Sequence, residues 1–177
     1  MLMRTRSMRG FTLIEIMIGL VILGLLMALG LPSFFTFLQN TQVRNAADSI
    51  QNGLQVARAE AIRRNTLVSF TIAGPDSTWS VDVNDPALNI EQHAGSEGAA
   101  NAQVAVSPGT LPLVIAFDGL GKSNLAAKTT IAVTNPVGGS CGTGAGNMRC
   151  LNVAISVGGQ VKMCDPQVTT AGDTRKC

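Results

Sequence analysis

Charged residues and histidine are scarce in this chain of 177 residues. Asp, Glu, Lys and Arg make up only 14% of it, whereas 46% is hydrophobic, a balance more apolar than that of a typical soluble domain. The single histidine, His93, stands in a polar stretch and is expected to be a solvated loop residue. Because no Ser-His-Asp or Cys-His arrangement can be assembled around one isolated histidine, the sequence predicts no enzyme.

Cysteine is also infrequent, and no pair is spaced as CxxC. The four cysteines are confined to the end of the chain, at Cys141, Cys150, Cys164 and Cys177. This spacing disfavours a zinc site, so we expect no metal and no cofactor. Clustered cysteines in even number indicate disulfides formed in an oxidising compartment. Short loops favour Cys141–Cys150 and Cys164–Cys177, although four cysteines permit three pairings.

The hydrophobic residues are concentrated in one run, Phe11 to Leu38, in which Glu15 is the only charged residue. The run is longer than the 7–15-residue core of a signal peptide and long enough to cross a membrane as a helix. We therefore divide the chain into a basic leader, a hydrophobic transmembrane and assembly helix, an amphipathic helix and a β-rich head. The expected bounds are 1–10, 11–38, 39–65 and 66–177.

Glu15 needs an explanation, because a charge inside a membrane helix costs roughly 2.5–3.5 kcal/mol on insertion scales. A positive partner would offset that cost. Cleavage between Gly10 and Phe11 would create one, namely a free α-amine at the start of the same apolar segment. The amine of a neighbouring subunit could then reach this carboxylate and set the register between subunits.

The residues at this junction resemble a known processing site. The stretch Arg9-Gly10-Phe11-Thr12-Leu13-Ile14-Glu15 is similar to the prepilin motif of type IV pilins and type II secretion pseudopilins. The resemblance implies that prepilin peptidase cuts after Gly10 and methylates the new amine of Phe11. It also implies that Glu15 is the assembly glutamate. Removal of the leader, with its three arginines, would change the formal charge from +2 to about −1, since ten basic residues then face eleven acidic ones.

Beyond Pro32 the pattern becomes amphipathic and then alternating. Apolar residues recur at helical spacing on one face up to Asn65, which we expect to end the helix: Val43, Ala47, Ile50, Leu54, Ala57 and Ala61. Period-two alternation then predicts strands. These are expected near 68–72, 79–83, 104–107, 113–117, 129–134, 150–157 and 161–164, with a surface loop over 84–103. The fold class is therefore α+β, a long N-terminal helix packed on a small antiparallel sheet with a disulfide-stapled C-terminal region.

Three further segments narrow the resemblance. The helix end at 56–65, the turn Phe117-Asp118-Gly119-Leu120-Gly121 and the tail around Cys164 are similar to the GspH/FimT group of minor pilins and pseudopilins. The tail favours the FimT/FimU branch. This implies a minor pilin that helps to initiate or cap a type IV pilus together with the major pilin and other minor pilins. It would cross the inner membrane once, with its head in the periplasm, before entering the pilus; a GspH-like pseudopilin of a type II secretion system is an alternative.

A second alternative is a pilin that binds DNA for natural transformation. Basic residues surround the cysteine-rich tail and could form a DNA-binding patch: Arg149, Lys162, Arg175 and Lys176. The resemblance implies a GRxR element on the last hairpin. This chain reads Gly159-Gln160-Val161-Lys162 there, with glutamine in place of the first arginine. A solvated polar rim is the other interpretation of the same residues.

Overall fold

A computed structural model of the chain describes residues 10–84, 86–142 and 148–177. Most of the predicted leader, residues 1–9, therefore lies outside the described residues. The chain divides into two compact units, Met1–Phe35 and Thr36–Cys177, and we describe each by itself. Helix α1 (Leu13–Arg64, 52 residues) passes through the boundary between them.

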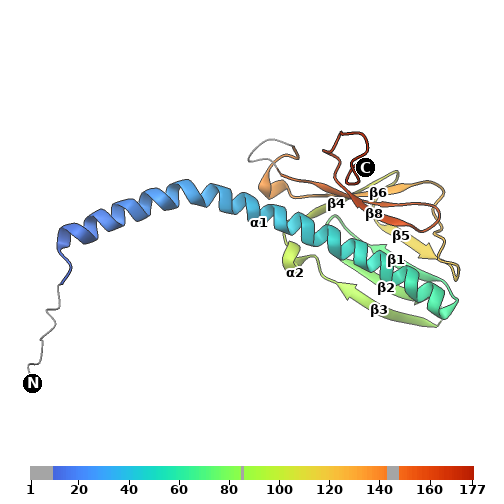
Figure 1. The fold of residues 1–177 in the computed structure, drawn as a ribbon. Helices are drawn as coiled ribbons and strands as arrows, with labels where there is room; N and C mark the ends of the chain where they lie inside the picture. Colours follow the sequence, from blue (N-terminus) through green and yellow to red (C-terminus); the bar gives the residue numbers. More distant parts are fainter. Residues whose placement is uncertain (1–9, 85, 143–147) are drawn as a thin grey trace, which may run out of the picture. The chain divides into compact units, whose positions relative to one another are not determined.

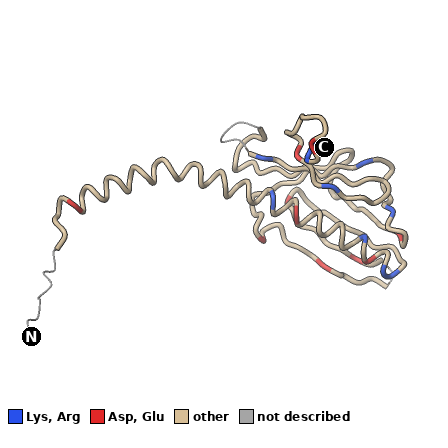
Figure 2. Tube along the Cα trace, in the orientation of Figure 1, with Lys and Arg blue, Asp and Glu red and all other residues tan. Residues whose placement is uncertain are grey.

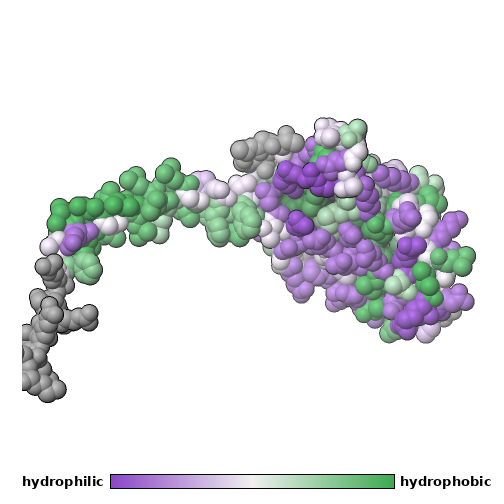
Figure 3. Space-filling view, in the orientation of Figure 1, coloured by the Kyte–Doolittle hydropathy of each residue, from purple (hydrophilic) through white to green (hydrophobic). Residues whose placement is uncertain are grey.

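The described part of the first unit is a helix with an apolar surface. Side chains from Leu13 to Phe35 are largely exposed, and α1 contains a strongly apolar stretch of 18 residues. By length and composition the helix can cross a membrane. Figure 3 shows this segment as almost continuously hydrophobic, and the tube in Figure 2 carries few charges there.

The second unit begins with the remaining turns of α1, whose predicted apolar face is confirmed. All six residues of that face are fully buried, and they are joined in the core by Ala46 and Gly53, which the helical pattern had not included. The helix ends at Arg64. Asn65 follows in the left-handed region with φ of 50°, a conformation that asparagine tolerates and that commonly ends helices.

Two antiparallel sheets, rather than the single small sheet expected, form the rest of this unit (Figure 1). One has the order β3-β2-β1-β5 and the other β4-β6-β7-β8. The strands are β1 (Val68–Ile72), β2 (Trp79–Asn84), β3 (Ala87–His93), β4 (Gln103–Ser107), β5 (Leu113–Phe117), β6 (Thr129–Thr134), β7 (Leu151–Ile155) and β8 (Val161–Cys164). The α+β class is confirmed, and seven strands lie close to their expected positions.

The prediction of one surface loop over 84–103 was wrong. This stretch contains β3 and the short helix α2 (Ser96–Ala99). The sequence did not indicate β3 because this strand lies at the edge of its sheet and is exposed along most of its length. With neither face fully buried, its sequence shows no alternation of apolar and polar residues. A register shift between Val81 and Asp82 of β2 further interrupts its pairing.

His93 is likewise not a solvated loop residue. It ends β3, and its ring stacks on Trp79 with the ring centroids 5.8 Å apart. The side chain is only 24% exposed, and its Nδ1 lies 3.5 Å from a carboxylate oxygen of Glu97. The sequence could not show this neighbourhood, because the contact depends on the pairing of β2 with β3.

The core lies where α1 packs on the sheets. Phe70 and Trp79 contact one another with centroids 5.6 Å apart, and the Trp79 Nε1 donates a hydrogen bond of 2.9 Å to the Ser49 hydroxyl on α1. Every buried hydrophobic residue among those described lies between Val43 and Cys164. The unit Thr36–Cys177 thus contains a complete core of its own.

Two disulfides close the C-terminal region. Cys141 is bonded to Cys150 and Cys164 to Cys177, with sequence separations of 9 and 13 residues, which is the pairing that short loops favoured. The turn η1 (Pro136–Gly138) precedes the first disulfide. After β8 the tail folds back, and the amide of Asp165 donates a hydrogen bond of 2.7 Å to the Arg175 carbonyl.

Candidate functional site

Glu15 lies in the first turn of α1 and contacts the residue that precedes the helix. The backbone N–H and the hydroxyl of Thr12 both donate to the same carboxylate oxygen, at 2.9 and 3.0 Å. The amide of Glu15 donates in return to the Thr12 hydroxyl at 3.3 Å. This reciprocal arrangement is a capping box, which satisfies N–H groups that the helix itself cannot pair.

The capping box was not anticipated, although its signal was visible as a threonine followed three residues later by glutamate. It gives Glu15 a fixed position at the helix start. Gly10 and Phe11 come immediately before this turn, outside the helix, and both are exposed. The expected cleavage bond therefore lies in a non-helical, accessible segment, four residues ahead of the glutamate.

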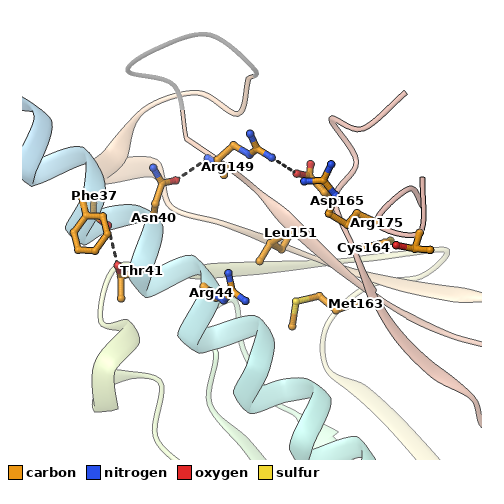
Figure 4. A pocket seen from close by; sticks show the side chains of 11 residues that line it. Phe37, Asn40, Thr41, Arg44, Arg149, Leu151, Met163, Cys164, Asp165 and Arg175 are labelled. Atoms are coloured by element: carbon orange, nitrogen blue, oxygen red, sulfur yellow. Dashed lines mark hydrogen bonds and ion pairs between the residues drawn. The ribbon is translucent and has the colours of Figure 1, made fainter. Parts of the chain in front are cut away.

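A second feature is a cavity of about 530 Å³ within the unit Thr36–Cys177 (Figure 4). It is bordered by α1, by the start of β7, by β8 and by the C-terminal tail. Its lining consists of Phe37, Asn40, Thr41, Arg44, Arg149, Leu151, Met163, Cys164, Asp165, Thr174 and Arg175. Apolar side chains and arginines thus line one partly open hollow.

Two of the four candidate DNA-binding residues border this cavity, and both are paired with carboxylates. Arg149 donates to Asp165 at 2.9 Å, and its backbone N–H donates to the Asn40 side chain on α1 at 2.7 Å. Arg175 donates to Asp173 through two guanidinium nitrogens, at 3.1 and 2.8 Å. Those hydrogen bonds lower the pKa of Asp173 to about 2, because they favour the charged carboxylate.

The other two candidates are placed differently. Lys162 and Met163 are consecutive in β8, so their side chains point to opposite faces of the sheet, and Met163 is the one that lines the cavity. The Lys162 ammonium donates to the Lys176 carbonyl at 3.0 Å, and the Lys176 ammonium donates to the Thr169 carbonyl at 3.3 Å. Two of the four basic residues thus line the cavity, and the ammonium groups of the other two donate to backbone carbonyls of the tail.

Arg44 joins the cavity from α1, which the sequence had not indicated. Its helical position marked it only as part of the polar surface, and the fold brings it to the same cavity as Leu151 of β7 and Met163 of β8 (Figure 4). Within the described ranges, His, Cys, Asp and Glu form no group of three or more that could hold a metal ion.

The fold and the N-terminal segment together define a class of protein. An exposed apolar helix with one carboxylate in its first turn, continuing into a head of antiparallel sheets, is the architecture of a pilin-like subunit. Sequence comparison agrees, because residues 5–31 match the family described as "Prokaryotic N-terminal methylation motif".

Residues 46–159 match the family described as "Type II transport protein GspH". This match covers more than half of the chain, which therefore belongs to the GspH family of pilin and pseudopilin subunits. Members of this family are structural proteins and not enzymes. A chain with this family's apolar N-terminal helix is a membrane-anchored subunit that assembles with other pilins.

Individual relatives are consistent with this assignment. The chain is 27% identical over 132 residues to a "Fimbrial protein" of Pseudomonas aeruginosa, covering 73% of this chain and 79% of that protein. Crystal structures of the type IV minor pilin FimU of P. aeruginosa share the fold. In one the TM-score is 0.55 at 19% identity, with 76% of this chain and 99% of that chain covered. In the other the TM-score is 0.52 at 17% identity, with coverages of 72% and 99%.

Proposed function

We propose that this chain is a minor pilin of a type IV pilus, which enters the filament through its N-terminal helix and helps to initiate or cap it. The observation that carries the proposal is the Glu15 carboxylate held in the first turn of an otherwise apolar helix, four residues beyond Phe11. The fimbrial relative and the fold shared with FimU support the pilus assignment.

The proposed processing begins at the exposed Gly10–Phe11 bond. Prepilin peptidase cleaves after Gly10, removes the basic leader and methylates the amine of Phe11. Because this amine is positive, it is an ion-pair partner for a Glu15 carboxylate in an apolar environment, where the attraction is stronger than in water. Pairing across subunits, rather than within one, would define the axial step between neighbouring helices.

Both Thr12 hydrogen bonds end on the same Glu15 oxygen, Oε2. A carboxylate has two oxygens and about four acceptor positions, so capping the helix does not exhaust its capacity to accept an amine. Glu15 can therefore stabilise its own helix and bind a neighbour's amine at the same time.

Before assembly, the subunit crosses the inner membrane once, with its head in the periplasm. Its partners are the major pilin and other minor pilins.

A pseudopilin of a type II secretion system is the second candidate, and the family match itself favours it. The two functions differ in where the processed subunit accumulates. A minor pilin is found in sheared surface pili. A pseudopilin remains in the cell envelope, and its loss abolishes secretion of substrate proteins rather than piliation.

Variants at Glu15 test the assembly proposal. Glu15→Gln retains a side chain able to complete the capping box but removes the charge. It should be processed and membrane-inserted yet largely absent from sheared pili in immunoblots. Thr12→Val keeps the charge, removes the side-chain cap and should enter pili at a level close to that of the unmodified protein. Normal entry of Glu15→Gln would refute charge pairing.

Processing is tested at the cleavage bond. Replacement of Gly10 by a bulkier residue should leave the leader attached, which is measured as the intact mass of the membrane-bound protein. The neighbouring change Ser7→Ala is the control and should be cleaved normally. A mature, methylated N-terminus at Phe11 in a Gly10 variant would contradict the assignment of the cleavage site.

A further inference from the structure

We propose that the cavity between α1, β7, β8 and the tail binds the headgroup of an anionic phospholipid, with part of an acyl chain on its apolar floor. This inference rests on the membrane anchoring included in the proposed function. The lipid ties the head to the bilayer surface until the subunit is extracted into the filament. The cavity, its charges and its place in the chain each contribute to this conclusion.

Two of the arginines that line the cavity, Arg149 and Arg175, have exposed side chains, whereas their carboxylate partners are largely buried. Arg149 and Arg175 have side chains 53% and 67% exposed. Their partners Asp165 and Asp173 are only 6% and 21% exposed. Since a guanidinium has five N–H donors, one or two bonds to a carboxylate leave several available to an incoming anion.

Arg44 adds a third cation, whose side chain is held less closely by a carboxylate than those of Arg149 and Arg175. Its side chain is 76% exposed, and the nearest carboxylate oxygen, on Asp48, lies 3.8 Å away, beyond hydrogen-bond distance. Asp48 is not among the lining residues. Arginine is well suited to phosphate because its planar fork donates two parallel hydrogen bonds. Three guanidinium groups against one lining carboxylate, Asp165, give the opening a net positive charge, which favours a phosphate rather than a cation.

Asn40, Thr41, Asp165 and Thr174 add polar groups to the lining, but most of the cavity surface is apolar. Phe37 from α1, Leu151 from β7 and Met163 from β8 face the same space (Figure 4). At about 530 Å³ the cavity falls within the usual range for small-molecule sites, roughly 300–1,000 Å³. Arginines above an apolar floor match an amphiphile with an anionic head. A free phosphate would leave the floor uncovered.

The place of the cavity in the chain identifies the source of that amphiphile. Phe37 belongs to the apolar run that we expect to cross the membrane, and Arg44 is six residues beyond its last residue, Leu38. Six helical residues rise about 9 Å, similar to the thickness of a headgroup layer, which is roughly 5–8 Å. Anionic lipid headgroups are therefore the phosphates nearest to these arginines before assembly.

Binding is tested with the head, residues 36–177, which contains the whole core and both disulfides. Dihexanoylphosphatidylglycerol is titrated below its micelle concentration and followed by NMR at the Met163 methyl and the arginine Nε–H groups. We expect saturable shifts with this lipid, much weaker binding of dihexanoylphosphatidylcholine, and weaker binding of inorganic phosphate. Equal binding of the phosphatidylcholine, or equally tight binding of phosphate alone, would overturn the proposal.

Matched arginine variants locate the site. Arg44→Gln should weaken binding about tenfold, the loss expected for one charge-assisted hydrogen bond, without unfolding the head because this side chain is exposed. Arg63→Gln, an exposed arginine in the last turn of the same helix, should leave binding unchanged. Equal effects of the two variants would refute a specific cavity.

The full-length chain provides a second measurement. In nanodiscs of phosphatidylcholine, addition of phosphatidylglycerol should slow hydrogen exchange of the Arg149 and Leu151 amides, and Arg44→Gln should abolish the effect. No change in the unmodified chain would overturn the proposal. Such a failure is distinct from failure of the pilin proposal, because Glu15-dependent entry into pili can be intact while lipid binding is absent.

Discussion

Single residues in this chain serve purposes that their types alone do not reveal. Glu15 both caps α1 through Thr12 and, in the proposed filament, supplies the counter-ion for a neighbour's amine. Gly53 has a purely structural role, because the helix approaches the sheet so closely there that no side chain fits. A Cβ at this position would lie 2.8 Å from Phe70 and 2.9 Å from Trp79.

Gly53→Ala should therefore destabilise the head although alanine is the better helix former. The gain in helix propensity is about 1 kcal/mol, whereas overpacking against two aromatic rings costs roughly 1–3 kcal/mol. Urea unfolding of residues 36–177 should show a net loss of stability. Asn52→Ala, at an exposed neighbour on the same helix, is the control, and a stabilised Gly53→Ala would contradict the close packing.

The ion pairs of Glu60 predict how the stability of the head depends on pH. Hydrogen bonds from Arg63 and Arg64 lower its pKa from 4.5 to about 2. Because the folded-state pKa is the lower one, the stabilisation is present above pH 4.5 and is lost as the pH falls toward 2. Because these ion pairs of Glu60 with Arg63 and Arg64 lie near the surface, the loss of folding stability should be below about 1 kcal/mol. NMR titration of the Glu60 carboxyl should give a midpoint well below 4, and Arg63→Gln should raise it.

At this scale the sequence reveals a residue that conflicts with its local surroundings, but not one whose role depends on a tertiary contact. Glu15 was conspicuous because a charge in an apolar run is costly. Arg44 was inconspicuous because an arginine on a polar helix face is ordinary. It becomes notable only where the strands β7 and β8 place Leu151 and Met163 beside it.

At the scale of elements, the pattern of burial decided which predictions were confirmed. Strand β1 alternates apolar and polar residues between two partners, and its bounds were predicted from that alternation. Strand β3 lies at an edge with little buried surface, so no pattern marked it. The tail after β8 has no regular structure along most of its length, and its last residue, Cys177, is bonded to Cys164.

Removal of that bond should therefore release the tail. In the double variant Cys164→Ser with Cys177→Ser, stability should fall by about 3 kcal/mol, the chain-entropy value for a loop of this size. Hydrogen exchange of the Asp165 amide, which donates to the Arg175 carbonyl, should accelerate. The matched variant Cys141→Ser with Cys150→Ser should lose slightly less stability and leave that amide protected. Equal protection in both variants would contradict a tethering role.

The whole molecule consists of a helix exposed for assembly and a head whose polar surface carries charges of both signs (Figures 2 and 3). The division between Phe35 and Thr36 separates the part built for apolar surroundings from the part with its own core. The distribution of charge on the head bears on DNA binding. Two of the four candidate cations, Arg149 and Arg175, form ion pairs with Asp165 and Asp173.

The head should accordingly bind DNA weakly at most. Each phosphate contact contributes to affinity and to its salt dependence, and two of the four candidate cations already pair with carboxylates. Fluorescence anisotropy with duplex DNA should show weak binding at low salt that disappears at ~150 mM. Lys162→Gln should reduce it, whereas the exposed Lys128→Gln should not. Tight binding at ~150 mM salt would instead favour the DNA-binding alternative.

The sequence by itself determined the apolar segment, the position of its carboxylate and the α+β class, because each depends on local composition and on periods of 3.6 or two residues. Tertiary structure alone decided that the strands form two sheets, that Gly53 lies against aromatic rings, and that Arg44, Arg149 and Arg175 surround one cavity. The physical reason is that these features join residues far apart in the chain, and their proximity follows from strand pairing and core packing rather than from any local pattern.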